Sequence, residues 1–460
     1  MDEIRLLVDF GSTYTKLVAV DIEKKELLAR AYVPSTIDSD ITIGLKEAIE
    51  IIKRDTKIDN IDGKQALACS SAAGGLRMIC IGFVPEYTSK AANYAALGAG
   101  AKVVGRFSYA LNSSEIKRIE ELSPDIILLS GGTDGGDYKV IIHNAKQLAE
   151  TDDSVNNIIV AGNKATHDEI KAIFKGSGKR LFFTENVMPE LKKLNLEPCK
   201  KIIRELFIHN IIETKGITKA REIIQDVIMP TPAAVLEAAK LIATGHGDEP
   251  GLGELMLVDV GGATTDVYSI GRGLPSRDNI ILEGIPEPFQ KRTVEGDLGL
   301  KHNIDTLAEL INDAMLIDIE KSALVQMMKA FQEGKLPTTE IQWSCHTILS
   351  QIAVEVAVNR HVGRLEILYS PEGQLLVQHG KDLTDVGYLL GTGGPLIYSS
   401  NPLRILEGAV FKDKTPNILK PKNPICFLDK SYIFYAIGLL SQSNPVEALS
   451  LAKKYMVQLT

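Results

Sequence analysis

Two stretches of this 460-residue chain follow the same pattern: LLVDFGSTYTK at residues 6–16 and LMLVDVGGATTD at residues 255–266. Each is an apolar run typical of a buried strand, followed by Asp-x-Gly, a small turn with hydroxyl side chains, and the start of a second strand. One such motif alone would indicate no more than a tight turn. Two copies after equivalent strands predict two related lobes, each with a β-hairpin of the same kind.

The turns of both hairpins suit phosphate binding. Glycine lets the backbone turn tightly and approach a ligand closely, and backbone N–H groups together with hydroxyl groups can bind phosphate oxygens. The candidate phosphate-binding residues are Gly11, Ser12, Thr13 and Lys16 in the first stretch, and Gly261, Gly262, Thr264 and Thr265 in the second. Two such hairpins that face each other across a cleft would hold a polyphosphate from both sides.

Each of the two first strands ends in an aspartate, Asp9 or Asp259. Two bare carboxylates beside phosphate groups are sensible only if a hard cation such as Mg²⁺ lies between them. We therefore expect Asp9 and Asp259 to be metal ligands. Asp259 or Asp266 would also position the attacking water, much as a general base does.

A third glycine cluster, LLGTGGP at residues 389–395, follows an apolar run. Pro395 suits the first turn of a helix that begins there. Gly391, Gly393 and Gly394 would let a flat base lie against the backbone, although a packing turn explains the cluster equally well when it is taken alone. Together with two phosphate hairpins, it predicts an adenine and ribose site, so the expected cofactors are ATP and Mg²⁺.

The rest of the chain predicts an α/β protein with four parts. Residues 1–87 form a first lobe, which opens with an antiparallel meander of three strands. In residues 88–185, strands alternate with helices, which indicates an inserted Rossmann-like α/β subdomain. Residues 186–253 are a mainly helical return and linker, and residues 254–460 form the second lobe with the second hairpin and the adenosine turn.

The loop Ser130–Asp137 contains four glycines and two aspartates, and it follows an apolar strand. Ligands of open α/β sheets bind at the carboxyl ends of the strands. The loop either contacts a small molecule or a partner's cofactor, or is a flexible connection without such a role. The sequence leaves both interpretations open.

The composition excludes several classes of protein. A hydrophobic fraction of 45% supports a large core, and a net charge of −8 argues against binding to nucleic acid or to an anionic membrane. No apolar run reaches the roughly 18–20 residues of a membrane span. Five scattered cysteines favour reduced thiols over disulfides or a metal cluster. The charged N-terminus is unlike a secretory signal, so we expect a cytoplasmic protein. A homo-oligomer is compatible with all of this.

The order of the three glycine motifs resembles the superfamily of actin, sugar kinases and seventy-kilodalton heat-shock ATPases. Residues 259–266 are similar to the chaperone pattern D-[LV]-G-G-x-T-x-D, and residues 229–234 and 436–440 are similar to its two linking motifs. The resemblance implies an actin-like ATPase fold with two ribonuclease-H-like lobes. One departure is Met229, which stands where the chaperones carry a glutamate that helps to order the metal's water shell, and this predicts slow hydrolysis.

A closer resemblance covers nearly the whole chain. The segments at residues 9–16, 70–76, 129–136 and 185–191 are similar to those of the MutL family that is associated with glutamate mutase. The resemblance implies a chaperone-like ATPase that reactivates an adenosylcobalamin-dependent mutase by helping damaged cobalamin to leave. The expected partners are therefore the mutase subunits.

Three other functions share parts of this sequence pattern. A small-molecule kinase would use the same hairpins, and an actin-like filament would use the same fold. An activator of radical dehydratases shares the first hairpin but holds an iron–sulfur cluster between subunits, for which this chain has no plausible pair of cysteines. The hairpins alone do not distinguish the reactivating factor from the kinase.

Overall fold

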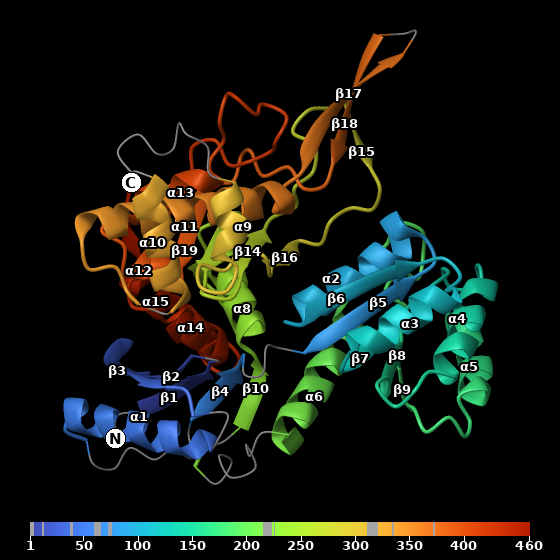
Figure 1. The fold of residues 1–460 in the computed structure, drawn as a ribbon, viewed down its shortest axis with the longest axis horizontal. Helices are drawn as coiled ribbons and strands as arrows, with labels where there is room; N and C mark the ends of the chain where they lie inside the picture. Colours follow the sequence, from blue (N-terminus) through green and yellow to red (C-terminus); the bar gives the residue numbers. More distant parts are fainter. Residues whose placement is uncertain are drawn as a thin grey trace. The chain divides into compact units, whose positions relative to one another are not determined.

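The computed structural model divides the chain into two compact units (Figure 1). Unit 1 comprises Met1–Glu237, Gly284–Pro288 and Gly438–Glu447, and unit 2 comprises Ala238–Glu283, Phe289–Ile437 and Ala448–Thr460. The residues described by the structure are 4–11, 13–36, 40–58, 66–71, 76–214, 223–224, 226–310, 321–333, 335–370 and 373–460.

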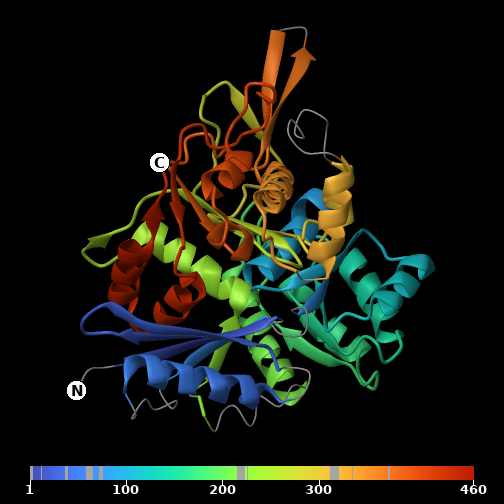
Figure 2. The same ribbon diagram turned by 60° about the vertical axis from the view of Figure 1, so that its left-hand side comes forward.

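The first sheet of unit 1 confirms the predicted meander. Its strands, in spatial order, are β10 (Asp226–Pro230), β4 (Leu67–Ser70), β1 (Ile4–Phe10), β2 (Tyr14–Asp21) and β3 (Glu26–Pro34). β1, β2 and β3 are antiparallel, whereas β4 and β10 run parallel to β1 on its other side. Helix α1 (Ile41–Thr56) begins after the N-cap Asp40 and lies along one face of this sheet (Figure 2). β10 was not expected, because the sequence around it indicated mainly helix.

The second sheet of unit 1 is parallel throughout, and its strands alternate with helices along the chain. Its strands, in spatial order, are β6 (Lys102–Ser108), β5 (Arg77–Gly82), β7 (Ile126–Leu129), β8 (Asn157–Val160) and β9 (Arg180–Phe183). β5 pairs with both β6 and β7, so this sheet includes residues that the sequence analysis assigned to the first lobe. β7 and β8 are fully buried, as strands covered on both faces must be.

Helices cover this parallel sheet and continue from it. They are the π-helical turn η3 (Pro85–Ser89), α2 (Lys90–Gly98), α3 (Ser113–Leu122), α4 (Lys139–Ala149), the 3-10 turn η4 (Lys164–Thr166), α5 (His167–Ile173) and α6 (Glu197–Thr214). Asn112 and Glu115 form a capping box at the start of α3, which satisfies backbone N–H groups that have no partner inside the helix. The apolar faces of α3, α4 and α5 pack with β7 and β8 into one core cluster.

The main sheet of unit 2 repeats the topology of the first sheet of unit 1. Its strands, in spatial order, are β16 (Gln290–Glu295), β14 (Thr265–Ile270), β13 (Leu255–Val260), β19 (Tyr388–Thr392), β20 (Ile425–Leu428) and β21 (Val457–Gln458). β13, β14 and β16 form an antiparallel meander, and β19 and β20 run parallel to β13 on its other side. The order β16-β14-β13-β19-β20 thus matches β3-β2-β1-β4-β10 in unit 1, strand for strand and in direction.

The helices of unit 2 pack on one core with this sheet. They are α9 (Ile304–Glu309), α10 (Lys321–Gln332), α11 (Glu340–His361), α12 (Gly394–Ile397), α13 (Pro402–Leu406) and the 3-10 turn η6 (Glu407–Ala409). A capping box of Thr339 and Gln342 starts α11, the longest of them. Three helices cross the boundary between the units: α8 (Thr231–Thr244), α14 (Phe434–Leu440) and α15 (Pro445–Tyr455).

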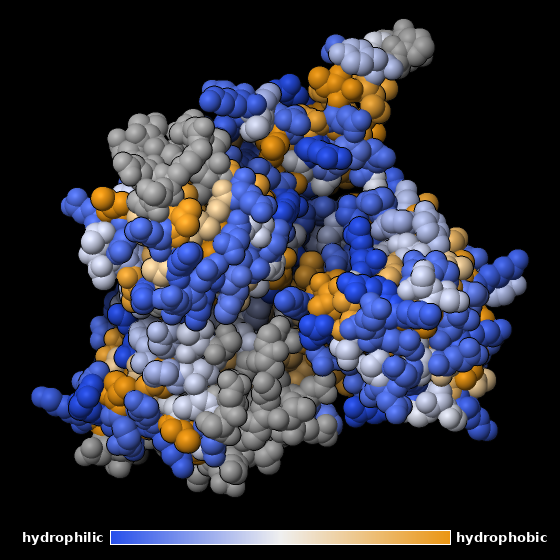
Figure 3. Space-filling view, in the orientation of Figure 1, coloured by the Kyte–Doolittle hydropathy of each residue, from blue (hydrophilic) through white to orange (hydrophobic). Residues whose placement is uncertain are grey.

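Smaller sheets complete unit 2. The strands β15 (Ile280–Glu283), β18 (Gly373–His379) and β17 (Arg364–Ser370) form one, and β11 (Gly245–His246) pairs with β12 (Glu249–Pro250) in the other. Apolar side chains of the β17–β18 hairpin are exposed, among them Ile367 and Leu375 (Figure 3). The helices of the described residues are each too short or too polar to span a lipid bilayer.

Candidate functional site

The first predicted hairpin joins β1 to β2 in unit 1. The Gly11 N–H donates to the Tyr14 carbonyl oxygen over 3.0 Å, which closes a four-residue turn. A Cβ atom on Gly11 would lie 2.6 Å from that oxygen, so the turn requires glycine. Thr13 is exposed at the turn, and Ser12 lies outside the described residues. The hairpin therefore has the tight turn that the sequence predicts.

Asp9 is not the bare carboxylate that the sequence analysis assumed. It is only 1% exposed, and the Lys16 ammonium, its partner across the two strands, donates to Asp9 Oδ2 over 2.9 Å. The hydroxyl of Thr231 donates to Asp9 Oδ1 over 2.6 Å. Thr231 belongs to the predicted linking motif, but nothing in the sequence indicated that it contacts Asp9. The negative charge of Asp9 is thus compensated within unit 1.

The second predicted hairpin joins β13 to β14 in unit 2 and closes in the same way. The Gly261 N–H donates to the Thr264 carbonyl oxygen over 2.9 Å. The turn rests on the segment after β16, where the N–H groups of Lys301 and His302 donate to the Gly262 carbonyl oxygen over 2.9 and 3.1 Å. Gly262 is exposed. The segment after β16 therefore supports one side of this turn, and the other side, at Gly262, is exposed.

Thr265 differs from the other predicted phosphate-binding residues. It is fully buried, and its hydroxyl donates to the Leu298 carbonyl oxygen over 2.8 Å. In the hairpin of unit 1, Thr15 stands at the equivalent place and is also buried. Residues at this position hold the hairpin to its own unit.

Asp266 forms a buried ion pair that the sequence analysis did not anticipate. Arg292 on the neighbouring strand β16 donates to Asp266 Oδ1 from Nε over 3.0 Å and from Nη2 over 2.7 Å. The Thr264 hydroxyl donates to Asp266 Oδ2 over 2.8 Å. Both carboxylate oxygens of Asp266 are thus occupied, which fits a residue that positions Thr264 better than one that activates water.

The third predicted motif lies directly beside the second hairpin. β19 runs parallel to β13, with Thr392 opposite Asp259. Gly393 has a φ of +95°, and a Cβ atom there would lie 2.2 Å from the Val260 carbonyl oxygen and 2.6 Å from Asp259 Oδ1. Only glycine fits this contact. The carboxyl ends of two parallel strands in unit 2 therefore bring the half-buried Asp259 and the glycine turn together.

Asp429 fixes this glycine turn from below, and the sequence analysis missed it. Its side chain is buried and accepts hydrogen bonds from the Thr392 hydroxyl over 3.1 Å and from the N–H groups of Ile433 and Phe434 over 2.9 Å each. Its own N–H donates to the Gly391 carbonyl oxygen over 2.9 Å. Because α14 begins at Phe434, Asp429 does not occupy its N-cap position, and the usual capping pattern in the sequence does not reveal it.

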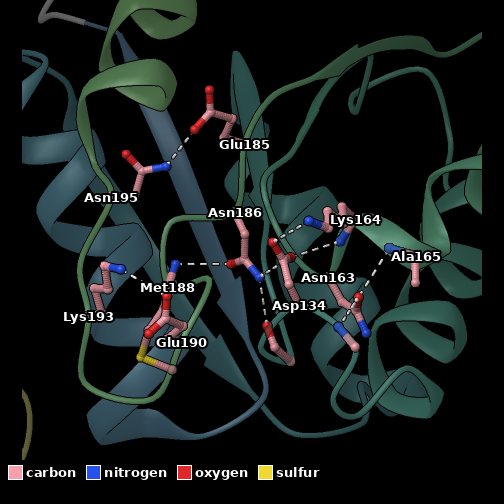
Figure 4. Close-up of polar contacts among 12 residues, drawn as sticks. Asp134, Asn163, Lys164, Ala165, Glu185, Asn186, Met188, Glu190, Lys193 and Asn195 are labelled. Carbon is pink, nitrogen blue, oxygen red and sulfur yellow. Dashed lines mark hydrogen bonds and ion pairs between the residues drawn. The ribbon is translucent and has the colours of Figure 1, made fainter.

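The loop Ser130–Asp137 in unit 1 is rigidly held rather than flexible (Figure 4). Asn163 accepts hydrogen bonds from the N–H groups of Gly135 and Ala165, and its amide group donates to the carbonyl oxygens of Gly136 and Asp137. Asn186 donates to the Gly132 carbonyl oxygen and to Asp134. Both asparagines are almost fully buried.

Within the described part of the chain, no group of three or more histidine, cysteine, aspartate or glutamate side chains is arranged to hold a metal ion. All five cysteines are buried and have free thiols in the structure. Burial raises the pKa of the Cys69 thiol, with a further contribution from the neighbouring Asp9. A protein-only metal centre is therefore not present among these residues, and a cation would need ligands from a bound phosphate as well.

Comparison with known proteins gives a consistent result. The family model described as "MutL protein" matches residues 5–456. Protein MutL of Clostridium tetanomorphum is 45% identical over 461 residues, which cover 98% of this chain and 99% of that protein.

Solved structures are similar only at a low level. Gluconate kinase from Lactobacillus acidophilus aligns over 100% of this chain and 93% of its own, with 10% identity and a TM-score of 0.36. A glycerol dehydratase reactivase aligns over 95% and 99%, with 10% identity and a TM-score of 0.34. Likenesses this distant do not bear on function. By its sequence, the chain belongs to the MutL protein family.

Proposed function

We propose that this protein binds ATP with Mg²⁺ and hydrolyses it slowly, on an actin-like ATPase fold with two ribonuclease-H-like lobes. The observation that carries the proposal is the duplicated hairpin. Gly11 and Gly261 close equivalent turns after Asp9 and Asp259, on two sheets with the same strand order. A packing turn has no need to recur at the same place in two units of one chain.

The residues of unit 2 fit a nucleotide and its metal best. The turn presents the exposed backbone of Gly262, and Asp259 supplies a hard oxygen ligand beside the glycine turn at Gly393. Bound Mg²⁺ would neutralise phosphate charge there. We propose that Asp259 is its protein ligand and also orders the attacking water.

In unit 1, we propose that the cation Lys16 binds phosphate oxygens together with Gly11, Ser12 and Thr13. The ion pair with Asp9 fixes the place of the Lys16 ammonium at the turn. Asp9 would then act mainly through Lys16 and only secondarily as a metal ligand.

Slow turnover is proposed because of Met229. It is 3% exposed and lies opposite Cys69 in the ladder between β10 and β4. An apolar thioether there cannot order metal-bound water as a carboxylate would. We expect a steady-state rate well below the roughly 10 s⁻¹ that is usual for metabolic enzymes.

The biological role that we propose is reactivation of an adenosylcobalamin-dependent mutase of the glutamate mutase type. Membership of the MutL family supports it, together with the resemblance of four separate segments to the family that accompanies this enzyme. The rigid loop Ser130–Asp137 and the exposed Tyr138 beside it would contact the mutase. A partner is remodelled only if the ATP and ADP states bind it with different affinity.

Calorimetry with ATP and Mg²⁺ tests the nucleotide site. Gly261→Val should abolish binding, because a Cβ atom at this position already lies 3.0 Å from the Thr264 carbonyl oxygen and the branched side chain fills the space for phosphate. Gly247→Val is a matched control, because Gly247 in unit 2 has no heavy atom within 4 Å of an added Cβ. Since Gly247 has a φ of +58°, the control variant must first be shown to be folded. Unchanged affinity in Gly261→Val would refute the assignment.

Rescue of a cobalamin-inactivated glutamate mutase tests the role. Tyr138→Ala should retain ATP hydrolysis but lose ATP-dependent rescue, whereas Tyr369→Ala, another exposed tyrosine, on β17 in unit 2, should retain both. Mutase affinity that is identical in ATP and ADP would contradict the role. Phosphoryl transfer to an added sugar or carboxylate would instead identify a small-molecule kinase.

A further inference from the structure

The α/β subdomain of unit 1 contains a pocket of about 640 Å³ that the proposed ATP site does not use. It lies at the carboxyl ends of β7, β8 and β9, and its lining includes Asp134, Phe183 and Asn195. Ligands of open α/β sheets bind at this end of the strands, and pockets for small molecules have volumes of roughly 300–1,000 Å³. Both its place and its size are those of a binding site.

The walls of this pocket are fixed before any ligand binds. Asn186 is 2% exposed and ties the loop after β9 to the loop after β7, by donating to Asp134 Oδ1 over 3.1 Å (Figure 4). The N–H of Asp134 donates to the Pro189 carbonyl oxygen over 2.9 Å, which closes the same contact from the backbone. A ligand would therefore meet a preorganised surface, which reduces the entropic cost of binding.

The polar atoms that remain available are mainly acceptors. Asp134 Oδ2 accepts no hydrogen bond from the described residues and lies 3.7 Å from the exposed Lys164 ammonium. Glu185 accepts one bond from Asn195 through Oε2, which leaves Glu185 Oε1 and Asn195 Oδ1 without donors in the same part of the chain. Two carboxylates and one ammonium give the lining a net negative charge, which disfavours anions.

The lining also includes aromatic and apolar side chains. The ring of Phe183 lies 4.9 Å from the ring of His167, centroid to centroid, with the two planes tilted by 49°, and Pro189 and Pro198 also line the pocket. Burial lowers the pKa of His167, so its imidazole is neutral at neutral pH despite the nearby carboxylates of Asp134 and Asp168. These side chains add no positive charge that would attract a phosphate, and the ring of Phe183 offers a flat face to a planar group.

The neighbouring loop after β5 does not provide a phosphate site either. The Thr88 hydroxyl accepts from the N–H groups of Phe83 over 2.8 Å and Val84 over 3.2 Å. These are backbone donors that a phosphate at this end of the sheet would need, and the protein occupies them itself. A nucleotide or flavin phosphate is therefore a poor match for this edge of the subdomain.

From this geometry we propose that the pocket binds a planar group rich in N–H donors, a guanidinium, an amidinium or a primary carboxamide, and that it rejects anions. The acceptors Asp134, Glu185 and Asn195 receive the donors, and Phe183 stacks against the plane. The residues of this pocket are separate from those of the two hairpins. The proposal therefore does not depend on whether ATP binds at the hairpins.

Three nearly isosteric probes test the proposal: benzamidine, benzamide and benzoate, which carry charges of plus one, zero and minus one. Their dissociation constants are measured on the full-length protein by ligand-observed NMR. We expect benzamidine or benzamide to bind at least about tenfold more tightly than benzoate. Equal affinity for benzamidine and benzamide would identify the group on the natural ligand as a carboxamide. A clear preference for benzamidine would identify that group as a guanidinium. Both results support the proposal.

Asp134→Asn should reduce the preference for benzamidine over benzoate about tenfold, and Glu185→Gln should reduce it by less, because Glu185 is more exposed. Asp168→Asn is the matched control: it removes a carboxylate next to His167 that does not line the pocket, and it should leave all three affinities within about twofold. Binding of benzoate as tight as that of benzamidine, no binding of any probe, or no effect of both Asp134→Asn and Glu185→Gln would overturn the proposal.

Discussion

The hairpins of the two units have the same backbone and opposite charge arrangements. In unit 1, Asp9 faces Lys16 across the strands, and the two form an ion pair. In unit 2, Asp259 faces Asp266, and the cation Arg292 on the neighbouring strand β16 is bound to Asp266. A lysine thus stands opposite the aspartate in the first hairpin, whereas a second carboxylate stands opposite it in the second hairpin.

From this difference we infer that the two copies of the motif have different roles in the proposed ATP site. A hairpin with a fixed lysine is suited to bind phosphate oxygens directly. A hairpin with two carboxylates facing each other across its strands is suited to bind a divalent cation that a phosphate also binds. In the function we propose, the equivalent turns bring both hairpins to phosphate, and the residue opposite the aspartate decides whether a lysine or a metal ion contacts it.

The largest expected effect is a loss of folding stability when the cation that pairs with a hairpin aspartate is removed, Lys16 in unit 1 or Arg292 in unit 2. Arg292→Leu should destabilise unit 2 by about 3–5 kcal/mol, because it leaves the buried Asp266 without its partner. Lys16→Met should cost less, about 1–3 kcal/mol, because Thr231 still donates to Asp9. Denaturant unfolding followed separately in the two units measures both. Equal losses would show that the two ion pairs are equivalent after all.

The next effect concerns the glycine turn that follows β19 beside the hairpin of unit 2. Gly393→Ala should weaken ATP binding about tenfold or more, since it combines a strained φ of +95° with a 2.2 Å approach to the Val260 carbonyl oxygen. Gly387→Ala is its control, because Gly387 precedes β19 and an added Cβ there has no heavy atom within 4 Å. Fluorescent nucleotide titration compares them, and similar affinities would remove the turn from the site.

A smaller effect is the expected dependence of the folding stability of unit 2 on pH. Burial lowers the pKa of His346 in unit 2 to about 4, and burial together with Lys291 and Lys381 lowers the pKa of His361 far below its usual value. Both are neutral in the folded protein and take up a proton on unfolding below pH about 6.5. Each of the two histidines should therefore cost unit 2 about 2 kcal/mol of stability between pH 7.5 and 5.

His346→Phe provides the control for the pH effect. His346 lies between the rings of Phe331 and Trp343, at 5.4 and 5.8 Å between centroids, so phenylalanine keeps the aromatic contacts and removes the titration. The variant should show a shallower loss of stability on acidification. A slope identical to that of the wild type would mean that other groups control the acid sensitivity of this unit.

Local patterns in the sequence predicted much of this structure. The apolar runs before Asp9 and Asp259 predicted the strands and the repeat, and Pro395 predicted the start of α12, because these signals depend on neighbouring residues alone. β5 was overlooked as part of the parallel sheet, since a short apolar strand does not reveal which sheet it joins. Its pairing with β6 and β7 depends on contacts distant in the sequence.

The sequence predicted the position of the candidate site better than it predicted the partners of its charged residues. The sequence located both aspartates, but it did not show that Thr231 reaches Asp9 from another strand or that Arg292 binds Asp266. These partners lie 222 and 26 residues away along the chain, and only the folded sheets bring them together. Charge compensation is a property of the tertiary structure, so the predicted bare carboxylates could not have been corrected from the sequence.

The most direct test of the central claim, that the second hairpin carries the metal and the first carries a phosphate-binding cation, is calorimetric titration of ATP at several Mg²⁺ concentrations. The proteins compared are the wild type, Asp259→Asn and Asp9→Asn. We predict that Asp259→Asn loses the dependence of ATP affinity on Mg²⁺, by about tenfold at saturating metal. Asp9→Asn should keep that dependence and weaken binding at every Mg²⁺ concentration alike. The reverse pattern, or the same loss in both variants, would contradict the division of labour between the two hairpins.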